Sequence, residues 1–494
     1  MEGKATTFLT SLLDRGLAAT YGTASKDGTK GTEAATGDDV DETAKSSSYS
    51  FERKRGPDTV ESGNRRACFL ENAKYFLITL IVWSHALDDF LAHSTRVNAE
   101  SWSVRKTKME VLSPILPFVR AVFLTLSTFS MPLFTAIAGF QSKSWLDLSR
   151  GHDVKSVVML ARLRRSTATL LGAWVLWQAL YCAVSYNDVR PLQWWAPIDV
   201  TWFLLALYIW RTSVLLVGNF RDGAIFGSLI ALAITVGFTE TPATANGLMF
   251  LDWQRVCTYA LYFYVGLVMV RKEDVDNFIR VFETEAPRPW LRITVGWIAL
   301  GLFFGAFLLA DYLGEPFEQM REWVLTAHPY GFEKWYYPFL EALMRIVLYF
   351  VVAITAAAFM CTIPVERYWF TSLGSRTMSA YLLHRVFLTV YDDLTTKFWD
   401  DDDIDVTLQI MIGTFALPLV VSQLCLSRPV VASVAPLVDP ALAFGESSEW
   451  LFYKQPGMGA DFSDTEDSEA SSHDGDDAKM VASDRDMAGS WRRE

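Results

Sequence analysis

The chain has 494 residues, of which 51% are hydrophobic, 14% aromatic and 20% charged; its mean hydropathy is +0.19 and its net charge −12. This composition excludes a disordered chain, a collagen-like fibre and a basic nucleic-acid-binding protein, and it argues against an ordinary soluble enzyme. The apolar residues gather in runs of about 18–22, which is the length that crosses a bilayer.

Most of the negative charge belongs to the two ends of the chain. Residues 1–64 hold 11 acids and 8 bases, and residues 455–494 hold 11 acids and 4 bases, so these ends carry −10 of the −12. We predict a disordered cytosolic tail over 1–64, a transmembrane domain over 65–430 and an acidic, largely disordered cytosolic tail over 431–494. The five scattered cysteines contain no CxxC pair, so the sequence predicts neither a disulfide framework nor a metal site.

The apolar runs predict an all-α, multi-pass integral membrane protein with about ten transmembrane helices. We expect them at 73–92, 117–140, 168–187, 200–218, 224–239, 256–271, 291–310, 344–363, 370–391 and 406–426. The basic residues between Arg53 and Arg66 precede the first run, which places the amino terminus in the cytosol. Ten crossings return the carboxyl terminus to the cytosol, and the host membrane is expected to be the plasma membrane or an endomembrane.

Aromatic residues are abundant in the longest predicted external loop, 311–343. They are Tyr312, Trp323, Tyr330, Trp335, Tyr336 and Tyr337. Such rings could stack on a sugar, but an interfacial aromatic belt is the preferred interpretation. The acidic run 399–403 lacks the glycine and the ligand spacing of an EF-hand, so a solvated loop explains it better than a calcium site.

Ionisable residues inside apolar runs are costly, so each is a functional candidate. Of the six histidines, only His85 and His384 lie well inside such runs. Lys74 precedes His85 by 11 positions, which puts both side chains on one helix face, about 16.5 Å apart along the axis. This spacing suits a long donor with phosphates at one end and a thioester at the other, such as acyl-CoA. Asp88 or Asp89 could orient the His85 ring for general base catalysis; the alternative is a histidine that hydrogen-bonds a neighbouring helix.

The segment 70–85 resembles the first helix of the acyltransferase-3 family of membrane proteins, and it is most similar to the fucose-4-O-acetylase-like branch. The family's opening motif is a basic residue, ten further residues and then histidine, which Lys74 and His85 match. Glu71 stands where relatives usually have aspartate. Further segments resemble the family's motifs in chain order at 130–140, 162–165, 202–210, 262–266 and 373–384, so the resemblance covers about 66–426.

The resemblance implies transfer of an acyl group, usually acetyl, from acyl-CoA to a hydroxyl of a sugar, glycan, lipid or small metabolite. It implies His85 as the catalytic base. Glu71, from its place in the motif, and Asp88, from its spacing to His85, are further catalytic candidates. The expected donor site contains Lys74, Arg162 and Arg165, because cationic side chains bind phosphates strongly. The basic pair at 162–165 could equally anchor the topology alone.

Three residues are candidates for acceptor binding: Ser130, His384 and Arg345. Ser130 replaces the family's usual histidine and Ala138 its usual serine, so the choice of acceptor could differ here. Arg345 lies one turn after Glu341, and a pair between these two side chains is the simpler interpretation. The expected partners are acyl-CoA, a hydroxyl-bearing acceptor and membrane lipid, with no metal and no nucleic acid.

Two other hypotheses remain open. A secondary transporter would also have about ten helices and intramembrane histidines, but we find no convincing internal repeat between 66–250 and 251–430. A catalytically degenerate member of the family would retain the motifs and lack turnover. Replacement of His85 separates an enzyme from a carrier, because only the enzyme consumes acyl-CoA.

Overall fold

The computed structural model describes residues 57–96, 115–151, 156–184, 196–239, 250–280, 289–314, 316–326, 329–330, 336–398 and 412–440. These residues form helices and their connections, and no strand lies among them. Most of both predicted tails and the acidic run 399–403 lie outside the described residues. Helix α2 begins at Pro57 and α18 ends at Val438, so short parts of the ranges expected to be tails are helical.

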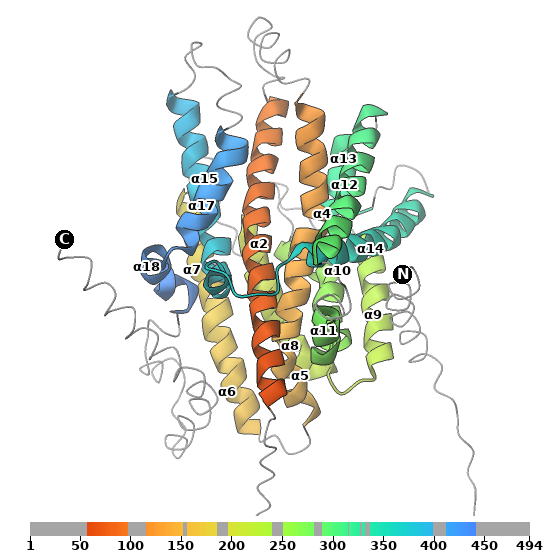
Figure 1. Cartoon of the computed structure of the whole chain (residues 1–494), viewed down its shortest axis with the longest axis vertical. Helices are drawn as coiled ribbons and strands as arrows, with labels where there is room; N and C mark the ends of the chain where they lie inside the picture. Colours follow the sequence, from red (N-terminus) through yellow and green to blue (C-terminus); the bar gives the residue numbers. More distant parts are fainter. Residues whose placement is uncertain are drawn as a thin grey trace, which may run out of the picture. The chain divides into compact units, whose positions relative to one another are not determined.

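The first half of the described chain contains helices that run along the bundle and shorter ones at its ends (Figure 1). They are α2 (Pro57–Arg96), α4 (Leu116–Gln141), α5 (Lys143–Arg150), α6 (Ser156–Ser166), α7 (Gly172–Val184), α8 (Trp202–Val217), α9 (Asp222–Thr235) and α10 (Trp253–Tyr264). The second half follows the same plan. It contains α11 (Lys272–Arg280), α12 (Pro289–Tyr312), α13 (Phe317–Leu325), α14 (Tyr337–Thr362), α15 (Thr377–Phe398), α17 (Leu417–Leu426) and α18 (Arg428–Val438).

Short turns of other helical types join or interrupt these helices. Four in the described residues are 3₁₀ turns: η4 (Asp199–Thr201), η5 (Val236–Phe238), η6 (Phe250–Asp252) and η9 (Thr371–Arg376). Three are π turns, η2 (Thr167–Leu171), η7 (Val265–Met269) and η10 (Ile412–Ala416). The π turns adjoin α7, α10 and α17, respectively, and such turns occur frequently near functional sites.

Every one of the ten predicted ranges overlaps a helix, but the number of crossings is not confirmed. Five described helices are long and apolar enough to span a membrane: Arg65–Ala92, Leu116–Gln141, Asp199–Val217, Trp290–Tyr312 and Tyr337–Thr362. A sixth span is possible if the helices Gly413–Leu426 and Arg428–Val438, bent by 71°, count as one broken crossing. Charged side chains and π or 3₁₀ breaks shorten the other apolar segments.

Helices α2 and α4 form the centre of the bundle. In Figure 1, α2 runs the length of the bundle with α4 beside it. The apolar window of α4 is 72% buried and that of α2 56%, whereas that of α12 is only 11% buried. The outward side chains of α12 are large and apolar, as lipid-facing positions require, and include Trp297, Ile298 and Leu302.

Glycines let the motif-bearing helices approach closely. A Cβ at Gly139 of α4 would lie 1.9 Å from the carbonyl oxygen of Phe263, and one at Gly266 would lie 1.8 Å from that of Ala136. No side chain fits at such distances, so α4 crosses the α10–η7 segment through two glycines, as small residues allow in membrane bundles. The segments 130–140 and 262–266, which both resemble family motifs, therefore pack directly against each other.

Ion pairs join separate segments at the two ends of the bundle. At the end where α2 begins, Arg66 pairs with Asp276 of α11 at 2.6 Å, and Arg150 of α5 pairs with Asp222 of α9. At the other end, Arg120 of α4 pairs with Asp311 of α12 at 3.2 Å. We call these two ends of the bundle the Lys74 end and the His85 end, because each is the end toward which that candidate site residue of α2 lies.

Candidate active site

Two histidines from distant parts of the chain meet inside the bundle. The ring centroids of His85 on α2 and His384 on α15 lie 5.2 Å apart, with an interplanar angle of 37°. His384 has no exposed surface, whereas His85 is half-buried. His85 is therefore the more exposed of the two imidazoles.

The hydrogen bond of His384 defines its tautomer. Its Nδ1 lies 3.0 Å from the carbonyl oxygen of Ala380, one turn earlier on α15. A carbonyl oxygen only accepts, so Nδ1 carries the proton and donates, and Nε2 presents a lone pair. That buried Nε2 has no hydrogen-bond partner among the described residues. The ring is thus oriented by its own helix and keeps one acceptor available beside His85.

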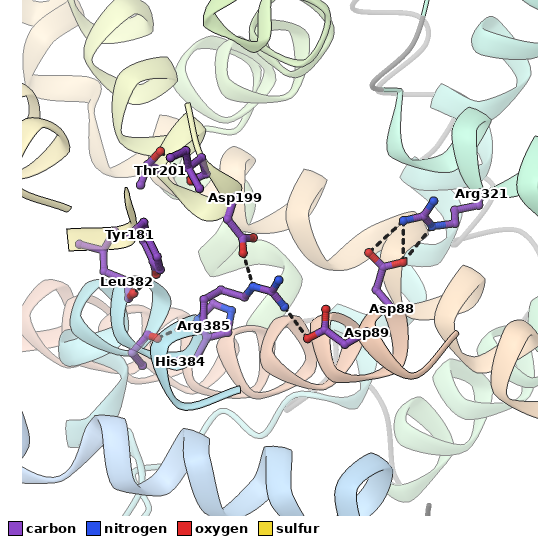
Figure 2. Close-up of polar contacts among 11 residues, drawn as sticks. Asp88, Asp89, Tyr181, Asp199, Thr201, Arg321, Leu382, His384 and Arg385 are labelled. Carbon is purple, nitrogen blue, oxygen red and sulfur yellow. Dashed lines mark hydrogen bonds and ion pairs between the residues drawn. The ribbon is translucent and has the colours of Figure 1, made fainter. Parts of the chain in front are cut away.

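Arg385 joins three elements next to the histidine pair. Its Nη1 donates to Asp89 of α2 at 2.5 Å, and its Nε donates to Asp199 at the start of η4. Figure 2 shows the guanidinium between the two carboxylates, with His384 beside it. A guanidinium that bridges two carboxylates fixes their separation through charge-assisted bonds. We call this the Asp89–Arg385–Asp199 bridge.

The turn that presents Asp199 is held in a specific backbone conformation. Asp199 has a φ of 52°, in the left-handed region that few non-glycine residues adopt. Gln178 of α7 stabilises the turn: its Nε2 donates to Ala196, and its Oε1 accepts from Ile198 N and from Thr201 Oγ1. Because the surrounding contacts hold the turn in this strained conformation, the carboxylate is aimed at Arg385 before any substrate binds.

A second ion pair ties α2 to α13. Arg321 donates to both carboxylate oxygens of Asp88, at 2.8 and 3.1 Å, in a bidentate arrangement that Figure 2 shows to one side of the bridge. Glu318 also accepts from Arg321, at 3.3 Å. We expected Asp88 or Asp89 to orient the His85 ring, but in the described part of the chain both carboxylates bind arginines instead.

Aromatic rings line the inner side of the histidine pair. Tyr381 lies one turn before His384, with ring centroids 6.1 Å apart, and it contacts Phe203 at 5.3 Å. Its buried hydroxyl has no partner among the described residues. Tyr181 of α7 donates its hydroxyl to the carbonyl oxygen of Leu382 and so connects α7 to the same part of α15 (Figure 2).

The comparisons with known proteins agree with the motifs that meet at this site. A family model described as an acyltransferase domain matches residues 69–423. The match contains both histidines, the bridge and all the segments that resemble family motifs. The chain belongs to this acyltransferase-3 family. Searches of curated proteins and of solved structures give no match.

Membership of the acyltransferase-3 family implies a membrane acyltransferase activity, and the apolar helices agree with a multi-pass membrane protein. The likeness to the fucose-4-O-acetylase-like branch stays a prediction. The predicted site residues lie in three places: at the His85 end, at the Lys74 end and in a separate cavity near α14.

At the Lys74 end, the predicted donor residues lie on two elements. Lys74 of α2 is buried and pairs with Glu71 at 2.7 Å, one turn away. Glu71 precedes His85 by 14 positions, roughly 21 Å along the helix, so it does not contact the His85 ring. Arg162 of α6 donates to the carbonyl oxygen of Ser144 at 3.1 Å, and Arg165 of the same helix is exposed.

The predicted acceptor residues lie in two places. His384 belongs to the histidine pair, and Ser130 of α4 is 1% exposed with a hydroxyl that has no partner among the described residues. Arg345 of α14 lies elsewhere. Its Nη1 donates to the carbonyl oxygen of Ala233 at 3.1 Å, and its guanidinium lies 4.6 Å from the ring centroid of Tyr330.

Sequence reasoning missed the residues that hold the site together. Arg385 is an ionisable residue inside a predicted span, so the rule that selected the histidines also applies to it. Asp199 directly precedes a predicted helix and carried no such signal. Arg321 lies in a predicted external loop, where an arginine is unremarkable. Only the fold shows that Arg385 and Arg321 bind the carboxylates of α2 and that Asp199 binds Arg385.

Proposed function

We propose that the chain is an acyl-CoA-dependent O-acyltransferase that moves an acyl group, with acetyl as the first candidate, to a hydroxyl-bearing acceptor. The observation that carries the proposal is the pair of imidazoles at the centre of a family-matched membrane domain. One imidazole is partly exposed, and the other is fully buried beside it with an Nε2 that has no partner among the described residues. Imidazole is the side chain most often used as a general base near neutral pH.

The reaction follows from ordinary acyl-transfer chemistry. His85 accepts the proton of the acceptor hydroxyl as that oxygen attacks the carbonyl carbon of the thioester. The carbon–sulfur bond then breaks, and the departing CoA thiolate takes the proton from the imidazolium. The products are an ester and free CoA, so atoms and charge balance. Direct transfer needs no covalent enzyme intermediate. His384 packs beside His85 and limits the orientations of its ring.

Buried polar groups give the site the capacity to hold a polar acceptor. The hydroxyls of Ser130 and Tyr381 and the Nε2 of His384 are buried without partners in the described residues. Buried polar atoms are normally satisfied, so such groups are candidates for substrate contacts. Ser130 lies one turn before Phe134, whose ring stacks on Tyr381 at 6.1 Å, which supports a common location for these groups.

The donor side of the proposal uses the Lys74 end. Acyl-CoA approaches from the cytosol, with its phosphates near Lys74, Arg162 and Arg165 and its thioester near His85. The length of α2 between Lys74 and His85, about 16.5 Å, suits the pantetheine arm between phosphate and sulfur. Binding requires that phosphate competes with Glu71 for Lys74, because these two side chains now pair.

The proposed topology has both termini in the cytosol. Its support comes from contacts between segments that the sequence predicts on the same side of the membrane. Arg66 with Asp276 and Arg150 with Asp222 join predicted cytosolic segments. Arg120 with Asp311 and Arg321 with Asp88 each join the predicted external loop 311–343 to the external end of a predicted span. The acceptor then approaches the His85 end from the external or lumenal side, or from the bilayer.

The test measures CoA release from acetyl-CoA by the purified, detergent-solubilised chain, with pooled sugars and lipids as acceptors. The expected result is acceptor-dependent release that His85→Gln abolishes while the variant still folds, as judged by its thermal melting curve. If the wild type releases no CoA with several acyl donors and acceptor pools, and also fails to bind CoA, the proposal is overturned and a carrier or a degenerate enzyme is favoured.

A further inference from the structure

A cavity of about 510 Å³ lies between α13, α14 and the segment around Tyr330, apart from the histidine pair. Three aromatic and three charged side chains dominate its lining: Trp323, Tyr330, Tyr337, Glu322, Glu341 and Arg345. The lining includes three of the six aromatic residues that the sequence assigned to an interfacial belt, together with Arg345. A belt presents its rings to the interface, whereas these rings enclose a space.

The walls of the cavity are held in place without a ligand. Tyr330 is 4% exposed, its backbone N donates to Gly237 at 2.7 Å, and its hydroxyl donates to the carbonyl oxygen of Ile234 at 3.0 Å. A Cβ at Gly237 would lie 2.3 Å from the Tyr330 ring, so the ring sits directly on a glycine. Arg345 packs on the same ring and bonds to Ala233. A preformed wall lowers the entropic cost of binding.

The chemistry of the lining selects among ligand classes. Two carboxylates and one guanidinium disfavour a phosphate, a nucleotide or another anionic group. A quaternary ammonium group would need the aromatic faces, but the Arg345 guanidinium already covers Tyr330 and would repel it. An acyl chain would place its methylene groups against two carboxylates and a guanidinium, and charged groups are a poor surface for apolar atoms.

A neutral sugar ring satisfies the lining. Its hydroxyls donate to Glu322 and Glu341 and accept from Arg345, and its apolar C–H face stacks on Trp323 or Tyr337. We propose that this cavity is a carbohydrate-binding subsite that holds a neutral pyranose unit of the acceptor, remote from the hydroxyl that reacts. We call it the α13–α14 subsite, and it rests on the proposed acyl transfer.

Helix α13 connects this subsite to the reaction centre. Glu322 and Trp323 line the cavity, whereas Arg321 binds Asp88, one turn after His85 on α2. Successive positions on a helix differ by about 100°, so one short helix presents its two sides to the two sites. A sugar chain held in the subsite therefore lies on one side of α13, and Asp88, close to His85, lies on the other side.

The test combines binding and transfer with the full chain in phosphatidylcholine nanodiscs. Calorimetric titration uses neutral tetrasaccharides of glucose, mannose, galactose and N-acetylglucosamine as probes. At least one tetrasaccharide is expected to bind, and Trp323→Leu is expected to weaken it about tenfold through loss of a stacking surface. Glu322→Gln, at an exposed position that does not endanger folding, is expected to weaken it about threefold. Trp297→Leu is the matched control, because Trp297 faces outward on α12.

The outcomes separate this inference from the proposed function. Trp323→Leu should raise KM for the oligosaccharide acceptor and leave kcat unchanged, whereas His85→Gln should abolish turnover and keep binding. If no tetrasaccharide binds, or if the two cavity variants bind like Trp297→Leu, the subsite inference fails while CoA release still stands. If sugar binds at Trp323 but no CoA is released, acyl transfer fails and the chain is a carbohydrate binder.

Discussion

The two ends of α2 are stabilised in different ways. At the Lys74 end, an ion pair joins Arg66 of α2 to Asp276, and the helix also packs against backbone. Asn72 Nδ2 donates to the carbonyl oxygens of Pro364 and Glu366, and Thr371 donates to Asn72 Oδ1. A Cβ at Gly374 would lie 2.2 Å from the carbonyl oxygen of Glu71. At the His85 end, α2 is held mainly by ion pairs, from Arg385 to Asp89 and from Arg321 to Asp88.

This difference indicates which contacts of α2 can shift when a substrate binds. Close backbone packing has one arrangement, because interiors are densely packed and a methyl group cannot be added. Ion pairs between long side chains tolerate small displacements and can exchange partners with a polar substrate. We therefore expect substitutions at the Lys74 end to act mainly on stability and on donor binding, and substitutions at the His85 end to act mainly on kcat.

The largest expected effect is that of His85→Gln. Loss of a general base lowers the rate by roughly 10²–10⁴-fold. The measurement is CoA release at saturating acetyl-CoA and acceptor. Trp83→Phe, two positions earlier on the same helix, is the control and should retain most of the activity. If His85→Gln retains wild-type turnover, His85 is not the general base and the reaction occurs elsewhere in the protein.

The next effect breaks the backbone contact at the Lys74 end. Gly374→Ala forces a methyl group against the Glu71 carbonyl and should destabilise the protein by about 1–3 kcal/mol. Thermal unfolding in detergent measures it. The control is Gly301→Ala on α12, where a Cβ meets nothing within 4 Å, and which should melt like the wild type or slightly higher. Equal melting of both variants would contradict the close packing.

Arg385→Gln tests the Asp89–Arg385–Asp199 bridge. Two carboxylates would lose their common partner and repel each other, so the position of α15 relative to α2 should change. We expect a fall in kcat of about tenfold or more with little change in KM for acetyl-CoA. Arg385→Lys keeps the charge but loses the fork, so it should recover only part of the activity. Full activity of Arg385→Gln would show that the bridge does not position the histidines.

Lys74→Met tests the donor side. Removal of one cation near the CoA phosphates should raise KM for acetyl-CoA about tenfold and leave kcat nearly unchanged, because charge-assisted bonds to phosphate are individually strong. Initial-rate kinetics over a range of acetyl-CoA concentrations measure both constants. A fall in kcat at unchanged KM would instead place Lys74 in the chemical step.

Asp88→Asn is expected to have the smallest effect. The Asp88–Arg321 pair is partly exposed, with side chains 28% and 30% accessible, so solvent screens it and the pair contributes about 1 kcal/mol or less. The melting temperature should fall by only a few degrees. A loss of activity as large as that of His85→Gln would show that Asp88 acts in catalysis as the sequence predicted.

The sequence allowed the helical class and the helix positions to be predicted, because apolar runs of bilayer length carry that information. It did not establish which runs cross completely. The proximity of His85 and His384 could not come from periodicity within either helix, since it depends on how α2 and α15 pack. The expected orienting role of Asp88 and Asp89 used spacing alone, and that spacing does not reveal arginines contributed by α13 and α15.

The π turns have a consequence for how this domain tolerates insertion and deletion. A π turn holds one more residue than an α turn, so removing one residue from η7 would restore a regular helix and rotate the helical residues after the deletion by about 100° relative to α10. A deletion at Val265 or Gly266 would remove Gly266 from its contact with α4, where a Cβ would lie 1.8 Å from the carbonyl oxygen of Ala136. Single-residue deletions within η2, η7 or η10 should therefore be far more harmful than equal deletions in the exposed ends of α12.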